Sequence, residues 1–212
     1  MVRSSFSLTA DQYYLGYTKT SEQKGKGLLR ELSTNTNRDV SLCATTAVVL
    51  NATELIVEKP LQLMNHIAGA RALVKESRWD ARSAGIGAAA FWVNVTMEVL
   101  CCLQYNWQVA WHPEDWGVDM DFEHVDAKEI GLPQDIWVHR MVNILARTVN
   151  FRATTPRYQE QADAALETRL AEWTNLTNMC YHWTSKIPHC MRPLAIIPTE
   201  RTRSKSNFPE IW

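Results

Sequence analysis

The run IGAAAFWVNVTMEVLCCL, from Ile86 to Leu103, decides the fold because it is the longest apolar stretch of the 212-residue chain. It is nearly long enough to cross a membrane as a helix. Asn94 and Glu98, however, lie four residues apart inside it and so share one helical face. A carboxylate at the centre of a bilayer is costly. We therefore interpret the run as the buried central helix of a soluble domain and expect no membrane among its partners.

Helical patterns continue on both sides of this run. Ser83 is the expected cap of the central helix, which we place at residues 84–105, and Asp39 is the expected cap of an earlier helix. Prolines, which favour the first turn of a helix, start the others. These helices are expected at 39–57, at 61–76, from Pro133 onward and from Pro156 onward. Because no window alternates with a period of two, no sheet is expected, and the sequence predicts an all-α fold of antiparallel helical hairpins packed around a central apolar helix.

Apolar residues recur at helical spacing along three of these helices, which predicts one buried stripe on each. The polar residues of the helix that starts at Pro133 are expected to face away from its stripe, namely His139, Arg140, Asn143 and Arg147. The three predicted stripes are Leu63, Met64, Ile67, Ala70 and Val74; Trp137, Met141, Ile144, Leu145, Thr148 and Val149; and Leu166, Leu170, Trp173, Leu176, Cys180 and Trp183.

The overall composition is that of an ordinary globular protein. Apolar residues make up 46% of the chain and charged residues 21%, and the net charge is −1. Non-specific binding to nucleic acid needs clustered Lys and Arg, so this balance argues against it. The N-terminal residues contain no apolar segment of the kind that directs secretion, which predicts an intracellular protein, in the nucleus or the cytoplasm.

The cysteines and the acidic residues do not have the spacing of a metal site. The five cysteines are odd in number and form no C-x-x-C pair, and Cys101 and Cys102 would diverge by about 100° on a helix. Asp119, Asp121 and Glu123 mimic the start of an EF-hand loop, but a histidine replaces its glycine at the sixth position. We therefore expect no metal, and we interpret this acidic segment as a solvated loop.

The residues from Gly85 to Ala90 satisfy the dinucleotide-binding pattern G-x-G-x-x-A. That pattern requires a preceding strand and an acidic residue about twenty positions later, and the sequence offers neither. We therefore interpret these small residues as a surface for close packing and expect no cofactor.

Nine tryptophans are many for a chain of this length, and several of them gather near Tyr105. Aromatic rings at such positions suit a cavity for an apolar small-molecule effector. The alternative interpretation makes the same rings anchors of the core, because tryptophan buries a large area. The candidate ligand-binding residues are Trp92, Tyr105, Trp107 and Trp111. The common metalloprotease and hydrolase motifs are absent, so no catalytic residue is assigned.

Four pieces of the stretch from Leu42 to Asp121 resemble the regulatory domain, or middle homology region, of fungal binuclear zinc-cluster transcription factors. They are the apolar helix that ends at Glu54, HIAGARALVKE at 66–76, FWVNVTMEVL at 91–100 and WQVAWHPEDWGVDMD at 107–121. The resemblance implies a helical scaffold that receives a signal and passes it on through a change in packing. The family's DNA-binding head needs six cysteines in C-x-x-C groupings, which this sequence lacks, so no direct DNA binding is expected.

The resemblance also implies a division of the chain. Residues 1–38 would form a helical lead-in, 39–187 the core of the regulatory domain, and 188–212 an irregular segment. The end of that segment, SKSNFPEIW, looks like the family's approach to a further helix, so the domain is expected to be truncated and to expose apolar surface. Such a module would regulate transcription by sensing an effector or by binding a partner, either a second copy of the chain or a full-length relative.

A second hypothesis comes from a different class of protein. A helical scaffold with a tryptophan-lined pocket would suit a small enzyme of fungal specialised metabolism, for example a cyclase that shields a reactive intermediate. An ionising terpene cyclase needs a D-D-x-x-D helix, which is absent, and the nearest carboxylates have the wrong spacing. The enzyme hypothesis predicts a closed pocket with perturbed titratable groups. A truncated regulatory module instead predicts an exposed apolar face and concentration-dependent association.

Overall fold

The structure, a computed structural model, describes residues 27, 39–54, 60–122, 133–156, 159–192, 194, 196–197 and 210–211. Its helices confirm the all-α prediction. The elements are α2 (Val40–Glu54), α3 (Pro60–Glu76), α4 (Gly85–Tyr105), the 3-10 helix η1 (Pro113–Trp116), α5 (Pro133–Ala153), α6 (Gln159–Lys186), the 3-10 helix η2 (His189–Met191), β1 (Ile196–Ile197) and β2 (Glu210–Ile211). Apart from residue 27, the lead-in predicted at 1–38 lies outside the described residues.

One small sheet departs from the expectation of no strands. β1 pairs with β2 in an antiparallel register that places Ile196 opposite Ile211. Each strand has only two residues, which is too short for an alternating pattern to show in the sequence.

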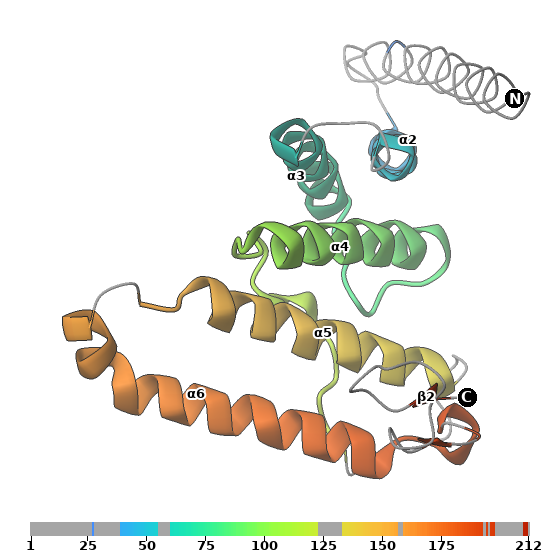
Figure 1. Cartoon of the computed structure of the whole chain (residues 1–212). Helices are drawn as coiled ribbons and strands as arrows, with labels where there is room; N and C mark the ends of the chain where they lie inside the picture. The colour runs from blue at the N-terminus through green and yellow to red at the C-terminus, as the bar shows by residue number, and fades with distance from the viewer. Residues whose placement is uncertain are drawn as a thin grey trace, which may run out of the picture.

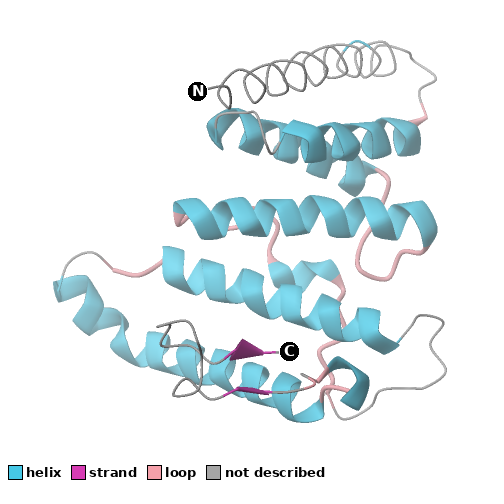
Figure 2. Cartoon of the chain, turned by 45° about the vertical axis from the view of Figure 1, so that its right-hand side comes forward, coloured by secondary structure: helices cyan, strands magenta, loops and turns pink. Residues whose placement is uncertain are grey.

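The helices are stacked in layers along one direction (Figures 1 and 2). α2 and α3 form the first layer, α4 lies against both of them, α5 follows, and α6 closes the opposite end. α5 and α6 run antiparallel, as their short connection predicts. α4 and α5 run in the same direction in Figure 1, so this pair is not an antiparallel hairpin.

Two predicted helix caps have different outcomes. Asp39 caps α2 as predicted, because its Oδ1 accepts the backbone N–H groups of Ser41 at 2.9 Å and Leu42 at 3.2 Å. Ser83 does not cap α4, since the residue at the N-cap is Ala84 and no side chain bonds there. The Ser83 hydroxyl instead accepts the backbone N–H of Asp80, which shapes the turn between α3 and α4.

α4 is the central helix that the apolar run predicted. Ten of its residues are buried, and its Phe91 meets three tryptophan rings edge to face: Trp92 at 5.0 Å, Trp111 at 5.3 Å and Trp116 at 6.2 Å between ring centroids. Within the described part of the chain, α4 is also the one helix long and apolar enough to cross a membrane. Because 56% of that apolar window is buried inside the structure, the helix has the surroundings of a core element.

Close packing explains one glycine of the G-x-G-x-x-A pattern. A Cβ atom at Gly87 would come within 2.8 Å of the indole ring of Trp79, a distance that the ring could relieve only by moving. The small residue therefore lets the turn after α3 lie directly on α4, in agreement with the interpretation of these residues as a packing surface.

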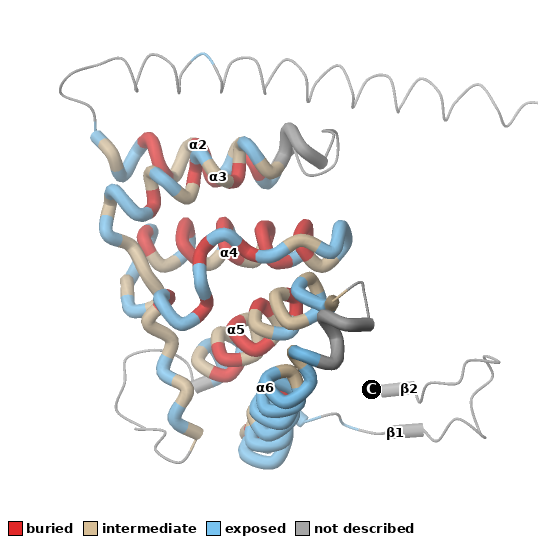
Figure 3. The backbone as a smooth tube through the Cα atoms, turned by 90° about the vertical axis from the view of Figure 1, so that its left-hand side faces the viewer, coloured by how far each residue is buried: buried red, intermediate tan, exposed pale blue. Residues whose placement is uncertain are grey.

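Most of the described part of the predicted α3 stripe is buried, whereas the predicted stripe of α6 is not. Ile67, Ala70 and Val74 of α3 lie in the core and Met64 is half-buried, while the side chain of Leu63 lies outside the described ones. On α6 only Leu176 is buried; Leu166, Leu170 and Trp173 are 63%, 60% and 57% exposed, and Cys180 is exposed as well. The physical reason is the place of α6 at the end of the stack, where α5 covers one side of it (Figure 3).

A buried carboxylate joins three parts of the fold. Glu98, which is 2% exposed on α4, accepts the backbone N–H of Ala110 at 2.7 Å through Oε1. Its Oε2 lies 2.6 Å from Nη1 of Arg71 on α3, a charge contact that lacks hydrogen-bond geometry. Glu98 therefore ties α4 both to α3 and to the segment that follows α4.

Replacing Glu98 by alanine should destabilise the protein strongly. The substitution leaves the guanidinium of Arg71 without its partner and the Ala110 N–H without an acceptor. We expect the free energy of unfolding to fall by about 3 kcal/mol. This value is at the lower end of the range for breaking a buried ion pair, because Arg71 keeps some contact with solvent. Urea denaturation measures this. Glu167→Ala, at an exposed glutamate of α6, is the control, and a Glu98→Ala loss no larger than that of the control would contradict the argument.

Candidate functional site

Polar side chains of α5 hold the segment that follows α4. Asn150 Oδ1 accepts the backbone N–H of Val109 at 2.8 Å, and Asn143 Nδ2 donates to the carbonyl oxygen of Pro113 at 2.8 Å. Further along, Arg140 donates from Nε to the carbonyl of Asp119 at 2.8 Å and from Nη2 to the carbonyl of Asp121 at 2.6 Å. The side chains of one helix thus replace the regular backbone hydrogen bonds that this segment lacks.

These contacts correct the predicted orientation of α5. Arg140 and Asn143 were expected to face away from the core, but each is only 1% exposed. His139, also expected outside, is half-buried and stacks on the indole of Trp92 at 3.8 Å between ring centroids. The prediction was wrong because it treated helix-to-helix packing as the whole of the core. The irregular segment 106–122 is packed there too, and it needs polar partners.

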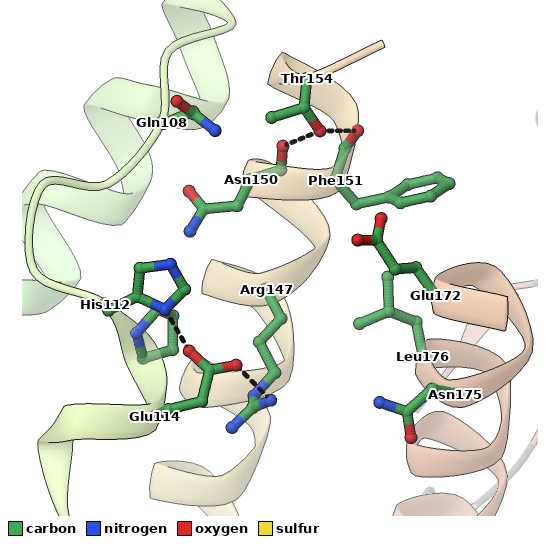
Figure 4. Close-up of a pocket in the computed structure, with 11 residues that line it drawn as sticks. Gln108, His112, Glu114, Arg147, Asn150, Phe151, Thr154, Glu172, Asn175 and Leu176 are labelled. Atoms are coloured by element: carbon green, nitrogen blue, oxygen red, sulfur yellow. Dashed lines mark hydrogen bonds and ion pairs between the residues drawn. The ribbon is translucent and has the colours of Figure 1, made fainter. Parts of the chain in front are cut away.

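A pocket of about 240 Å³ opens beside this polar stripe (Figure 4). Its walls come from three places: the segment from Gln108 to Glu114, the C-terminal half of α5 between Arg147 and Thr154, and the middle of α6. Figure 4 shows Glu172 and Asn175 of α6 pointing toward the other two walls. The pocket therefore lies where the irregular segment, α5 and α6 meet.

Glu114 is the centre of a charged network on one wall. Its Oε1 lies 2.6 Å from Nη1 of Arg147, its Oε2 is in short contact with Nδ1 of His112, and Arg147 Nε donates to Asn143 Oδ1 at 2.8 Å. Burial alone would raise the pKa of Glu114, but the hydrogen bonds from His112 and from its own backbone, with the charge of Arg147, lower it below its usual value. This carboxylate is therefore ionised and already paired.

Three other polar side chains of the lining have no such partners. Within the described residues, no hydrogen bond or ion pair is made by the carboxylate of Glu172, by the side-chain amide of Asn175 or by that of Gln108. The aromatic ring of Phe151 is engaged: the guanidinium of Arg169 lies 4.1 Å from its centroid. One carboxylate and two amides of the lining thus keep their full hydrogen-bonding capacity.

The four predicted ligand-binding residues are distributed over two places. Trp92 and Trp111 pack around Phe91, and the ammonium group of Lys75 lies 4.5 Å from the ring centroid of Trp111. Tyr105 and Trp107 form a separate tilted pair with centroids 5.1 Å apart. None of the four lines the pocket beside Glu114. Their role in ligand binding stays a prediction.

Asp119, one possible metal ligand of the acidic segment, is paired with the backbone and with an arginine. The carboxylate of Asp119 accepts the N–H of Asp121 at 2.8 Å and lies 3.1 Å from Arg140 Nη2. No group of three His, Cys, Asp or Glu side chains suited to a metal ion occurs among the described residues; those at 123–130 lie outside them.

The cysteines are free thiols with contrasting surroundings. Cys43, Cys101 and Cys102 are buried, while Cys180 and Cys190 are exposed. Burial, with the nearby charge of Glu98, raises the pKa of Cys102 to about 12, and the same causes raise that of Cys101. The Cys102 thiol donates to the carbonyl of Gln108 at 3.3 Å. These two adjacent thiols are therefore protonated and unreactive at neutral pH.

The sequence contained a signal for the pocket that was not used. Asn143, Arg147 and Asn150 recur at intervals of four and three residues, which places them on one face of α5. A polar stripe beside an apolar one indicates that two different surfaces cover the helix. Nothing in the sequence, however, showed that Glu172 and Asn175 would lie opposite, because that contact joins residues far apart in the chain.

Comparison of the chain with models of protein families, with curated proteins and with solved structures finds no match.

The stacked pair of His139 and Trp92 should make stability depend on pH. Burial lowers the pKa of His139, and the charge of Asp135 offsets this only in part. The unfolded chain therefore binds a proton more readily than the folded one, so stability is highest above about pH 6.5 and falls as the pH drops toward the folded pKa. His139→Phe keeps a stacked ring that does not titrate and should flatten this fall, measured by urea denaturation between about pH 7 and pH 5.

The control is His189→Gln, which removes an exposed histidine and should leave the pH dependence unchanged. An equally steep fall in the His139→Phe protein would show that other groups cause it.

Proposed function

We propose that the chain is a regulatory protein-interaction module of the kind found in fungal zinc-cluster transcription factors, and that it acts by pairing with a second copy of itself through α6. The module would work inside the cell, in the nucleus or the cytoplasm, without binding DNA directly. The observation that supports the proposal is the exposed apolar face of α6.

Four large side chains form this face: Leu166, Leu170, Trp173 and Tyr181, which are 63%, 60%, 57% and 67% exposed. At about 100° per residue, they fall within a sector of about 80° around the helix axis. Figure 3 shows the contrast, since α6 is exposed along nearly all of its visible length while α4 carries a buried face. Contiguous apolar surface of this kind is typical of interaction sites.

Two threonines within the same sector do not interrupt it. The hydroxyl of Thr177 donates to the carbonyl of Trp173 at 2.8 Å, and the hydroxyl of Thr184 donates to the carbonyl of Cys180 at 2.9 Å. Both hydroxyls thus have partners in their own helix. The 28 residues of α6 span about 42 Å, so the face is long enough for a helix-to-helix interface.

The spacing and the charges favour an antiparallel pair. Leu166, Leu170, Trp173 and Thr177 follow intervals of four, three and four residues, the repeat of a two-helix seam. The N-terminal half of α6 contains four carboxylates, and its single cation, Arg169, donates to Phe151 and Thr155 of the same chain. The C-terminal half contains Lys186 and no carboxylate. Antiparallel pairing would set each half that is rich in carboxylates against the half of the other copy that contains none, which avoids repulsion between like charges.

A charge on the face should break the pair. We expect the wild-type chain to show a concentration-dependent dimer in sedimentation equilibrium, and Leu170→Glu to weaken it by about tenfold or more, which corresponds to about 1.4 kcal/mol, because each copy would then bury an unpaired carboxylate. The matched control is Leu42→Glu, since Leu42 is 50% exposed on α2, far from this face. It should leave the dimer unchanged.

Two outcomes would contradict the proposal. One is a wild-type chain that stays monomeric at high micromolar concentration. The other is a dimer that Leu42→Glu weakens as much as Leu170→Glu, which would place the interface elsewhere.

A further inference from the structure

We propose that the pocket between the segment 108–114, α5 and α6 binds a small amine that carries hydroxyl groups, with the ammonium against Glu172. This site is distinct from the pairing face, although the two meet at Trp173. Glu172 and Asn175 line the pocket, and Leu170 does not. The ring of Trp173, which is 57% exposed, also lies 6.2 Å from the ring of Phe151 between centroids. A ligand could therefore occupy the pocket in the monomer and in the dimer alike.

The charges of the lining select a cation. Arg147 is engaged by Glu114 and by Asn143, so its charge is balanced within the wall. Glu172 adds a second carboxylate, for which the described residues provide no cation. Apart from His112, the charged groups of the lining are two carboxylates and one guanidinium, which sum to −1. A single positive group on the ligand neutralises this net charge.

The neutral groups select hydroxyls in addition to the charge. Gln108 and Asn175 present side-chain amides on opposite walls, and each amide can both donate and accept a hydrogen bond. A hydroxyl group has the same dual capacity, so the hydroxyls of a polyhydroxylated ligand can pair with either amide. A purely aliphatic amine could not hydrogen-bond to these amides, which would then bond only to water.

The apolar part of the pocket excludes a different mode of cation binding. Phe151 is the aromatic ring of the lining, and the guanidinium of Arg169 already lies over it at 4.1 Å. A ligand cation beside that ring would be repelled by the arginine. The ammonium is therefore directed to the carboxylate of Glu172, and Leu176 provides an apolar contact for the carbon skeleton.

Glucosamine and glucose form a matched pair of probes, because they differ by one amino group in place of one hydroxyl. We expect isothermal titration calorimetry of the whole chain at low ionic strength to show glucosamine binding at millimolar concentration, and glucose binding about threefold or more weakly, the size of an exposed ion pair. Added salt should weaken the glucosamine complex, because salt screens an exposed charge contact. Glu172→Gln should lower glucosamine affinity to that of glucose.

Glu167→Gln is the control variant, since it removes the same charge from the same helix outside this pocket. It should bind glucosamine as the wild type does. Absence of glucosamine binding, equal affinity for glucose, or equal losses in the two variants would overturn the proposal. The last result would mean that the probe senses only the overall charge of α6. Far-ultraviolet circular dichroism of both variants confirms that each is folded.

Discussion

The polar stripe of α5 is the constraint on which the rest of the structure depends. The segment 106–122 contains only one short 3-10 helix, so most of its backbone groups need partners other than their own neighbours. Asn150, Asn143 and Arg140 supply them at three points along about three turns of α5. Because Trp111 and Trp116 belong to the same segment, this anchoring also places their rings against Phe91. The polar stripe therefore organises the aromatic core.

The same anchoring explains why an ionised network can exist beside an apolar core. A buried arginine is costly unless its donors are satisfied. Arg140 meets this condition at Nε and Nη2, through two backbone carbonyls and the carboxylate of Asp119, while its Nη1 has no hydrogen-bond partner among the described residues. Arg147 meets it through Glu114 and Asn143, nearer the surface. The segment and α5 are thus mutually dependent, since the segment needs donors and acceptors and the arginines need carbonyl and carboxylate oxygens.

The parts of the fold that depend on nearby residues could be predicted from the sequence. The capping of α2 by Asp39 involves residues two and three positions away, and the burial of α4 follows from its apolar composition. The prediction failed where the partner lies far along the chain. A polar residue on a helix looks the same whether it faces water or the carbonyl of Pro113, thirty positions away, as Asn143 does.

The tryptophans illustrate a second limit of sequence reasoning. Their clustering near Tyr105 was consistent with a ligand cavity and with a core, and both interpretations bury large rings. The two are distinguished by what fills the space between the rings. Around Phe91, the rings of Trp92, Trp111 and Trp116 lie at edge-to-face distances from its ring, and the role of Trp92 and Trp111 in ligand binding stays a prediction. The described pocket lies instead among charged and amide groups, which composition does not bring together.

α6 links the proposed interface to the proposed pocket. Its neighbour in the stack is α5. The contacts between the two helices include the hydrogen bond from Trp183 Nε1 to the carbonyl of Trp137 at 2.7 Å. Arg169 of α6 also contacts Phe151 and Thr155. A ligand between Glu172 and the opposite wall would add further contacts between α6 and α5 on the pocket side. A second copy would add to these contacts from the other side of α6, by covering Leu170 and the exposed part of Trp173. If each binding event restricts how α6 lies on α5, thermodynamic linkage requires that each strengthen the other by the same factor.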